Sequence, residues 1–404
     1  MEKTDIIEDK DNHKSYAGGH KRGGLARLSY PLDPFGLLGV DKSPPSLFVS
    51  FMIRSKYMDD TNLNNRQKQI LSILKQKGNV TRQELTEGIS VKKGISKITI
   101  IRDLNNLINN KLAKVEGKGK NTRYSLFETN SLLTYLDLDS YFIEEDRIIK
   151  KRLDASVFDH LSDLYSPDEI RLWEKSKKVF KEAQEKLDPS IYKRELERFV
   201  IELSWKSSQI EGNTYSLIET ETLIKQNIKA SGRSDEEAVM ILNHKEAFEA
   251  ILAKKNSFRK IDFSDIIQLH QLLIKGLITS GIRSQKVRIS GTQYEPLSDK
   301  REIEKILRQL IEHVNKTEYP PEKALILAIM IAYIQPFADG NKRTSRMLSN
   351  AVLMAYDFPP LSYRSINVNE YRNAMIVFYE TNNLYNFKYL YLKQLQFVIE
   401  NYFQ

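Results

Sequence analysis

The sequence predicts a mostly α-helical protein in which a small mixed α/β domain precedes a larger helical domain. Residues 63–127 carry three short helical patterns followed by two short strand patterns. From residue 192 to the end, one helical pattern follows another, without the alternation of strand and helix that builds a doubly wound sheet. At about 150 residues per domain, a chain of 404 residues holds two or three domains, and we expect two.

The composition limits the chemistry. Apolar residues make up 41% and charged residues 28% of the chain, which is typical of a globular protein. No run approaches the ~20 apolar residues of a membrane span, and the first residues lack the apolar core of a signal peptide, so we expect a cytoplasmic protein with no membrane partner. The absence of cysteine excludes disulfides, thiolate metal sites and thiol nucleophiles, and leaves six histidines for acid–base chemistry.

Four segments follow from these patterns. We expect residues 1–60 to be a disordered leader or the product of a mis-assigned translation start, because they show no sustained period and Met52 and Met58 are alternative starts. The other three segments are the small domain at 61–130, a helical connector at 131–191 and the large helical domain at 192–404.

Residues typical of helix ends predict the boundaries of the first two helices of the small domain. An apolar stripe at residues 70–74 stops at Gly78, where a loop follows. Thr81 and Glu84 have the spacing of a capping box, so a second helix should begin there and end near Gly88.

A third helix should begin after Ser96, which can cap it. We expect its apolar side chains to point inward: Ile98, Ile101, Leu104, Leu107 and Ile108. We expect three side chains of its N-terminal half to point outward: Lys97, Thr99 and Arg102. Such a helix start fits the major groove of DNA.

Two strand patterns, at residues 113–117 and 122–127, flank a tip that contains Lys118 and Lys120. Three helices followed by a basic hairpin make a winged helix, and this segment resembles the winged helices of bacterial repressors. Residues 63–127 contain fourteen Lys or Arg against four Asp or Glu, a net charge of +10, whereas the whole chain carries +9. We therefore expect this domain alone to bind a polyanion, DNA.

Other interpretations of the small domain stay open. A single basic helix is also compatible with a solvated face, and some winged helices bind protein instead of DNA. A palindromic operator would require a homodimer, but the sequence shows no dimer interface.

One stretch of the large domain, residues 335–346, has the pattern of an anion site. An apolar helix at residues 328–334 ends at Pro336, and a second helix resumes after Lys342, so a helix N-terminus points at the loop between them. Gly340 and Asn341 permit a tight turn of exposed amides. Lys342, Arg343 and Arg346 add cations, and Asp339 could bind Mg²⁺, so the stretch suits a triphosphate. The alternative is a loop whose charges are only solvated.

The same stretch, Gln335-Pro-Phe-Ala-Asp-Gly-Asn-Lys-Arg-Thr-Ser-Arg346, resembles the signature of the Fic family. Residues 207–213, Ser-Ser-Gln-Ile-Glu-Gly-Asn, resemble the inhibitory motif of that family, and residues 281–296 resemble its hairpin flap. The resemblance covers about residues 192–404.

The resemblance implies a helical Fic domain with a short β-hairpin flap that transfers AMP from ATP to a hydroxyl of a target protein. Phe337 would lie in the core beneath the loop, and Asp339 would hold Mg²⁺. The phosphates of ATP would be bound by five residues of the signature: Gly340, Asn341, Lys342, Arg343 and Arg346.

The resemblance also implies inhibition within the chain. Glu211 would pair with Arg346 and take the place of the γ-phosphate, with Ser207, Gly212 and Asn213 completing the inhibitory motif. The flap would hold the target peptide by strand addition through three residues: Val287, Ile289 and Tyr294.

Two residues depart from the family pattern. Gln335 stands where the family has its catalytic histidine, and glutamine cannot act as a general base near pH 7. We expect His244 and His270, which lie in amphipathic helices, to be structural rather than to replace that base. Lys342 stands where adenylyltransferases have glycine. The Doc branch of the family also has lysine at this position. A catalytically inactive, ATP-sensing transcriptional regulator and a Doc-like protein kinase are therefore the alternatives to an adenylyltransferase.

Overall fold

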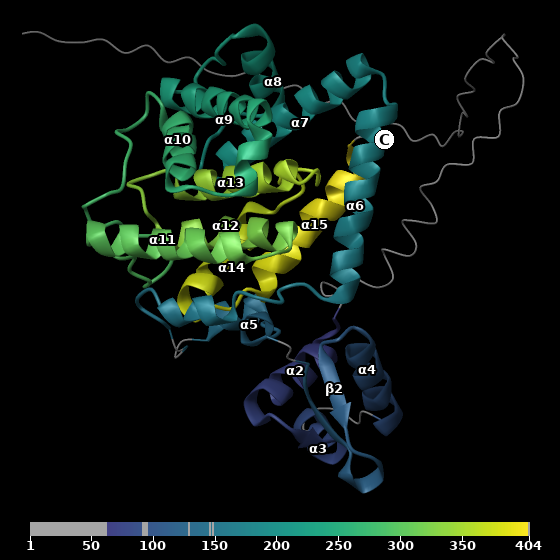
Figure 1. The fold of residues 1–404 in the computed structure, drawn as a ribbon. Coiled ribbons are helices and arrows are strands. Elements are labelled where there is room, and N and C mark those ends of the chain that lie inside the picture. The colour runs from purple at the N-terminus through teal and green to yellow at the C-terminus, as the bar shows by residue number, and fades with distance from the viewer. Residues whose placement is uncertain (1–62, 91–95, 128–129, 145–146, 148, 403–404) are drawn as a thin grey trace, which may run out of the picture. The chain divides into compact units, whose positions relative to one another are not determined.

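Three helices and a three-stranded sheet form the first folded segment in the computed structural model, which describes residues 63–90, 96–127, 130–144, 147 and 149–402 (Figure 1). The elements run in the order α2 (Asn65–Lys77), β1 (Val80–Thr81), α3 (Arg82–Ser90), α4 (Lys97–Asn109), β2 (Ala113–Glu116) and β3 (Arg123–Leu126). A 3₁₀ turn, η2 (Gly119–Asn121), forms the tip between β2 and β3. The predicted leader at residues 1–60 lies outside the described residues.

Side-chain caps explain where these helices begin. Asn64 and Gln67 form a reciprocal capping box at the start of α2, and the Ser96 side chain accepts a hydrogen bond from the backbone of Thr99 at the start of α4. The sheet has the strand order β1-β3-β2 with both pairings antiparallel, and Val115 lies opposite Tyr124. The sequence did not predict β1, because two residues are too few for a period.

The prediction for the buried face of α4 was wrong at one residue. Ile98 is 69% exposed, whereas Ile100, Leu104 and Leu107 are buried. At 3.6 residues per turn, positions 100, 104 and 107 share one face of the helix and position 98 lies on the opposite side.

After β3, the described residues form three short helical segments that precede two long helices. They are η3 (Ser131–Leu133), α5 (Leu138–Ile143) and η4 (Ala155–His160), followed by α6 (Pro167–Lys186) and α7 (Pro189–Ile210). Proline occupies the first turn of both long helices, where its missing N–H costs nothing, and Asp188 caps α7. The break predicted at Asp188 and Pro189 is therefore present, and α7 includes residue 192, where we predicted a domain boundary.

Helices make up the remainder of the chain. They are α8 (Leu217–Gln226), α9 (Asp235–Ala253), α10 (Phe263–Ile274), α11 (Lys300–Lys316), α12 (Pro320–Ile334), α13 (Asn341–Ala355), α14 (Val368–Thr381) and α15 (Tyr385–Asn401), with the 3₁₀ turn η5 (Lys255–Arg259) after α9. α12 and α13 lie at the centre and pack against each other, with α9, α10, α11, α14 and α15 around them (Figure 1). α12 is buried all round from Pro321 to Ile334, which explains its nearly continuous apolar sequence.

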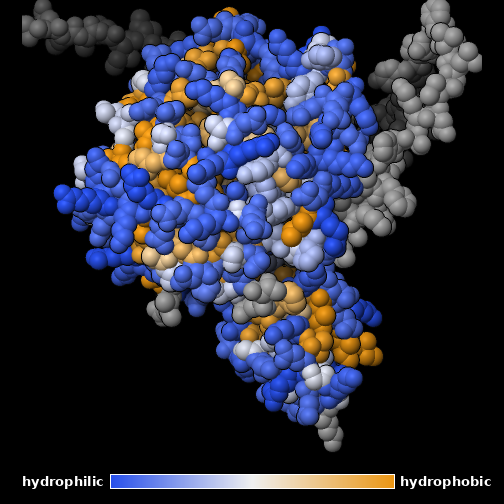
Figure 2. All heavy atoms as spheres, in the orientation of Figure 1, coloured by the Kyte–Doolittle hydropathy of each residue, from blue (hydrophilic) through white to orange (hydrophobic). Residues whose placement is uncertain are grey.

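The outer helices are amphipathic. α11 buries Ile303, Leu307, Leu310 and Val314 and exposes charged residues between them. Figure 2 accordingly shows mainly hydrophilic atoms over α11. In the described part of the chain, no helix is both long and apolar enough to cross a membrane.

The predicted hairpin at residues 281–296 is not formed as strands. The segment is irregular, and its only backbone pairing of strand type in the described structure is a bridge between Glu295 and Arg152. The Glu295 N–H donates to the Lys151 carbonyl at 2.8 Å. Apart from this bridge, the backbone of the described residues 281–296 pairs with no strand.

Candidate functional site

The loop between α12 and α13 is held in one conformation by backbone geometry. Gln335 ends α12 with φ 53° and Gly340 precedes α13 with φ 78°. A Cβ on Gly340 would lie 2.9 Å from the Ile274 Cγ2 atom, so glycine is needed there for space as well as for its positive φ.

Asn341 fixes the loop through its side-chain amide. Its Oδ1 accepts from the Phe337 N–H at 2.9 Å, and its Nδ2 donates to the Phe337 carbonyl and to Gln335 Oε1, both at 2.9 Å. The other end of the Gln335 amide, Nε2, donates to the Ala332 carbonyl at 2.7 Å. Both polar atoms of the Gln335 side chain are therefore engaged, one by Asn341 and one by the last turn of α12, and the residue is 8% exposed.

His270 on α10 supports the loop from beneath. Its ring stacks on Phe337 with centroids 3.5 Å apart, and its Nε2 lies 3.0 Å from the Asp339 carbonyl oxygen. Burial lowers the pKa of His270 to about 4, so at neutral pH the ring is uncharged and its Nε2–H donates to that carbonyl. Phe337 is fully buried, as the sequence predicted, and His270 has the structural position we expected.

Three cations of the first turns of α13 surround the loop: Lys342, Arg343 and Arg346. Arg343 is 1% exposed, and its guanidinium donates to Asp339 Oδ2 at 2.6 Å and to the Leu273 carbonyl at 3.3 Å. The Arg343 Nε is buried and has no hydrogen-bond partner among the described residues. The Asp339 side chain is 61% exposed and can reach a ligand from solvent.

Glu211, at the end of α7, bridges the other two cations. Its Oε1 lies 2.8 Å from Arg346 Nη2 and its Oε2 lies 2.9 Å from Lys342 Nζ. Burial raises the pKa of Glu211, but Arg346 and Lys342 together outweigh it and lower the pKa to about 2. Burial lowers the pKa of Arg346, but Tyr371 and Glu211 raise it above its ordinary value. Both partners are ionised at neutral pH.

Ser207 adds a second contact between α7 and Arg346. The Arg346 Nε donates to Ser207 Oγ at 3.0 Å and its Nη2 donates to the Ser207 carbonyl at 2.9 Å. On the other side, Ser207 Oγ lies 2.8 Å from His244 Nε2. The predicted residues Ser207 and Glu211 thus meet Arg346, while His244 is a neighbour that the sequence did not assign to them.

The other two residues of the predicted inhibitory motif shape the turn after α7. Gly212 has φ 100°, which favours glycine. Asn213 accepts from the Tyr215 N–H at 3.0 Å and donates to the Glu237 carbonyl on α9 at 2.9 Å. Both residues therefore place the end of α7 rather than contact the cations.

Of the three predicted flap residues, Tyr294 is the one whose side chain lies in the core. It is 2% exposed, its hydroxyl donates to the Tyr333 carbonyl at 2.8 Å, and its ring stacks on Tyr333 and Tyr379. The Tyr294 side chain is therefore not exposed to a partner, and strand addition at this residue would depend on its backbone. Val287 and Ile289 are half-buried and alternate with exposed residues, so they remain available to a partner.

The residues predicted to bind DNA lie on α4 and the β2–β3 tip. Lys97, Arg102 and Lys118 are exposed, and Thr99 is half-buried beside Ser96 in the cap of α4. Lys120 belongs to η2. The arrangement leaves basic side chains of both elements open to solvent.

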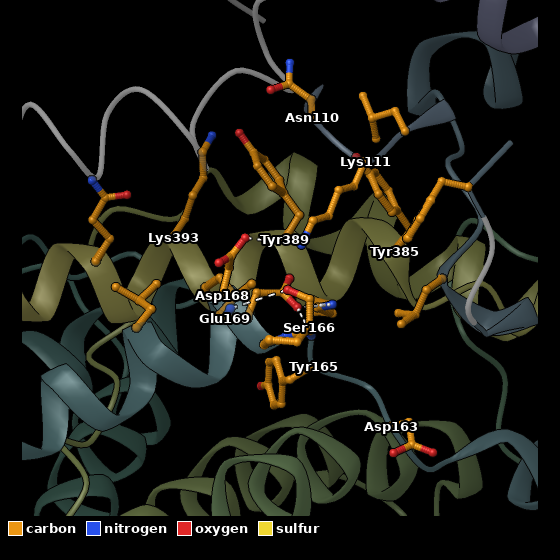
Figure 3. A pocket seen from close by; sticks show the side chains of 18 of the residues that line it. Asn110, Lys111, Asp163, Tyr165, Ser166, Asp168, Glu169, Tyr385, Tyr389 and Lys393 are labelled. Carbon is orange, nitrogen blue, oxygen red and sulfur yellow. Dashed lines mark hydrogen bonds and ion pairs between the residues drawn. The ribbon is translucent and has the colours of Figure 1, made fainter. Parts of the chain in front are cut away.

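A cavity of about 390 Å³ lies away from this loop (Figure 3). Residues of α6 and α15 line it together with the end of α4. Two ion pairs occupy its wall, Lys111 with Asp168 at 3.2 Å and Lys388 with Glu169 at 2.8 Å. Both lysines are therefore held by carboxylates of α6.

Family profiles match the two parts of the chain that carry these features. Residues 260–353, which include the loop and its cations, match the Fic/DOC family. The chain contains a Fic/DOC domain. Residues 66–117, which include α4, match the DeoR-like helix-turn-helix domain. The Fic profile does not extend to Glu211, whose contacts with Arg346 and Lys342 come from the structure.

Known sequence relatives carry the name protein adenylyltransferase Fic. The protein from Nematostella vectensis is 29% identical over 186 residues, which are 44% of this chain and 43% of that protein. The one from Drosophila virilis is 31% identical over 165 residues (39% and 33%), and the one from Culex quinquefasciatus is 25% identical over 275 residues (63% and 53%). The chain therefore spans about a third to a half of the length of these curated relatives.

Two solved structures are similar to part of this chain at lower identity. Fic-1 (residues 134–508) of C. elegans has a TM-score of 0.48 at 22% identity, covering 58% of this chain and 72% of that one. A Fic family protein of Desulfovibrio desulfuricans gives a TM-score of 0.48 at 21% identity, covering 58% and 74%.

The contact between Lys342 and Glu211 is a further feature of the candidate site that sequence reasoning missed. A signal for it was present, because Lys342 and Arg346 are four residues apart in a helix and so share one face. The partner of Lys342 could not be read from that spacing.

Proposed function

We propose that this protein is a Fic-type protein adenylyltransferase that transfers AMP from ATP to a Ser, Thr or Tyr hydroxyl of a target protein and is inhibited by its own α7. The observation that carries the proposal is the Glu211 carboxylate, which holds Arg346 and Lys342 at 2.8 and 2.9 Å. A carboxylate in this place competes with an anionic ligand for the same cations. The naming of the relatives as adenylyltransferases supports the choice of reaction.

In this proposal, different residues of the loop bind the phosphates of ATP and the Mg²⁺ ion. The amides at the start of α13, after Gly340, would bind phosphate oxygens, and Arg343 would hold the β- and γ-phosphates once its contact with Asp339 loosens. One exposed carboxylate, Asp339, fits Mg²⁺, which is commonly held by one or two carboxylates together with phosphates and water. The ion would neutralise charge on the phosphates.

In the proposed reaction, the oxygen of the target hydroxyl attacks the α-phosphorus of ATP and the bond from that phosphorus to the β-phosphate oxygen breaks. AMP joins the target, and pyrophosphate leaves. The hydroxyl proton must pass to water, because Gln335 has no basic group and its amide is bound to Asn341 and Ala332. The loss of a positioned base typically slows such a step by ~100- to 10,000-fold, so we propose slow transfer.

The same engagement of Gln335 favours a second candidate, an ATP-sensing transcriptional regulator without turnover. In that case ATP would displace Glu211 and change how the helix-turn-helix domain binds DNA. Equal operator binding by the wild type and Arg346→Ala across a range of ATP concentrations would contradict this coupling. A Doc-like kinase is less well supported, because the Doc branch is short and lacks the Glu-containing inhibitory helix to which the segment of Ser207 and Glu211 is similar.

For the helix-turn-helix domain, we propose that α4 enters the major groove of DNA and that the β2–β3 tip contacts the phosphate backbone of the DNA. The match to a DeoR-like helix-turn-helix domain and the exposed Lys97, Arg102 and Lys118 support this. Such a role places the protein in the cytoplasm, with DNA, ATP and a target protein as its partners.

Calorimetry with ATP and Mg²⁺ tests the proposal. We expect weak binding by the wild type, tighter binding by Glu211→Gly, and loss of binding when Arg343→Ala is added, with Arg301→Ala, an exposed arginine, as the matched control. Glu211→Gly is then incubated with a lysate and with ATP labelled at the α- or γ-phosphate. Slow transfer of the α-label supports the adenylyltransferase, transfer of the γ-label identifies a kinase, and binding without transfer identifies the sensor.

A further inference from the structure

Lys342 and Arg346 leave the same face of α13, one turn apart. Each pairs with a different oxygen of Glu211, so a single carboxylate is shared by two cations. The pair of Glu211 and Arg346 is shielded from water, since their side chains are 14% and 1% exposed, whereas the Lys342 side chain is 30% exposed. Charge-assisted contacts in such surroundings are stronger than those on an open surface.

Two positive charges at this place face one negative charge. Arg343 does not share in the contact, because it pairs with Asp339. A terminal phosphate carries up to two negative charges and three acceptor oxygens, so it matches Lys342 and Arg346 better than a carboxylate does. The position of the Glu211 carboxylate therefore marks a site built for a more highly charged group.

We propose that Lys342 is a specificity-determining residue: once Glu211 has moved away, it binds the terminal phosphate of ATP together with Arg346 and so selects the triphosphate over the diphosphate. ADP, bound in the same pose, ends one phosphate short of the two cations. The inference rests on the proposed function, because it takes the nucleotide to occupy the loop at the start of α13.

The alternative is that Lys342 only holds Glu211 in place. A residue with that role acts only while Glu211 is present, whereas a phosphate ligand acts in its absence. The two roles therefore separate in the Glu211→Gly background. Lys245 on α9 supplies a matched control, since it also pairs with a glutamate, Glu249, at 2.8 Å but lies away from the loop on the surface.

The experiment compares three proteins by calorimetry with ATP, ADP and AMP, each with Mg²⁺: Glu211→Gly, Glu211→Gly/Lys342→Met and Glu211→Gly/Lys245→Met. Methionine keeps most of the length of lysine and removes the charge. We expect Lys342→Met to weaken ATP binding roughly ten- to hundredfold, the usual effect of losing one charged contact, and to change ADP and AMP binding by less than about threefold. The control should leave all three affinities unchanged.

The outcomes are distinct. Unchanged ATP affinity in Glu211→Gly/Lys342→Met, or equal weakening of ATP and ADP, would overturn the role of Lys342 and leave the proposed function standing. Failure of Glu211→Gly itself to bind ATP would overturn the proposed function. Circular dichroism of each variant shows whether a lost affinity comes from unfolding.

Discussion

Ser207 on α7 and His244 on α9 are joined by a hydrogen bond of 2.8 Å between Oγ and Nε2, and both residues are fully shielded from solvent. The His244 Nδ1 lies 2.8 Å from the Met240 carbonyl, so it carries the proton, and Nε2 accepts from the Ser207 hydroxyl. Ser207 Oγ accepts in turn from Arg346. The histidine thus sets the direction of the hydrogen bonds between α7 and Arg346.

Replacing His244 should loosen the inhibitory helix. In His244→Leu the Ser207 hydroxyl loses its buried acceptor, which costs about 1–3 kcal/mol of unfolding free energy. The same change should strengthen ATP binding, because α7 leaves Arg346 more readily. Chemical denaturation and calorimetry measure the two effects, with the exposed His160→Leu as control. Loss of stability without any gain in ATP affinity would show that His244 is structural only.

Stability should fall as the pH drops below the ordinary pKa of histidine. Burial lowers the pKa of His244 to about 3, with the cations Arg343 and Arg346 adding to the effect, and burial lowers that of His270 to about 4. Both pKa values are lowered in the folded state, so the unfolded chain binds more protons between about pH 6.5 and 4. The stabilisation is therefore complete above pH 6.5 and decreases through that window, by up to roughly 1.4 kcal/mol per pH unit for each histidine.

Denaturation curves between pH 7 and pH 5 measure this slope. We expect His244→Gln and His270→Gln each to make the decline of the unfolding free energy shallower, whatever they do to stability at pH 7. Identical slopes in the wild type and in both variants would contradict the assignment of neutral, buried histidines.

Removing the charge of Glu211 should make stability depend on ATP. In Glu211→Gln, Arg346 stays buried without its counter-charge, and breaking a buried pair typically costs about 3–5 kcal/mol. ATP supplies a new partner, so added nucleotide should raise the melting temperature of Glu211→Gln more than that of the wild type. Thermal melts with and without ATP test this, and Glu249→Gln, in the surface pair with Lys245, is the control. An equal shift in both proteins would mean that Glu211 does not compete with ATP.

The loop should not tolerate a side chain at residue 340. Gly340→Ala places a Cβ 2.9 Å from Ile274 at φ 78°, so we expect a loss of about 1–3 kcal/mol of unfolding free energy and weaker ATP binding. Gly232→Ala is a matched control, because Gly232 also has a positive φ, 76°, but a Cβ there meets no atom within 4 Å. Equal losses in the two variants would show that backbone strain alone, and not the packing on Ile274, limits residue 340.

The basic side chains of α4 should contribute to DNA affinity through phosphate contacts. For each of Lys97→Ala and Arg102→Ala we expect the slope of log K against log salt to decrease by about one if the side chain neutralises one phosphate. Fluorescence anisotropy on duplex DNA at several salt concentrations measures the slope. Lys75→Ala, an exposed residue on α2, is the control and should leave the slope unchanged.

Local patterns predicted the helices well where they were long or strongly capped. The start of α4 after Ser96 and the break at Asp188 followed from capping residues and proline, which act within a few residues of chain. Local patterns did not predict which face of α4 is buried. The prediction put Ile98 on the buried face instead of Ile100. A helix rich in isoleucine has more than one apolar stripe, and the sequence does not say which of them packs inward. Only packing against the sheet decides between them.

The sequence by itself determined the chemistry that is available: no cysteine, a loop with three cations and one carboxylate, glutamine in place of the family histidine, and a concentration of positive charge in residues 63–127. It also placed Lys342 and Arg346 on one helix face, since a four-residue spacing is a local property. The resemblance of residues 207–213 to the inhibitory motif implied the pairing of Glu211 with Arg346, but only the tertiary structure showed that Lys342 and His244 join the same network. Glu211 and Ser207 come from α7 and His244 from α9, and only the packing of those helices against α13 brings these side chains within hydrogen-bonding distance. Contacts across such sequence separations depend on the whole core, so no local pattern encodes them.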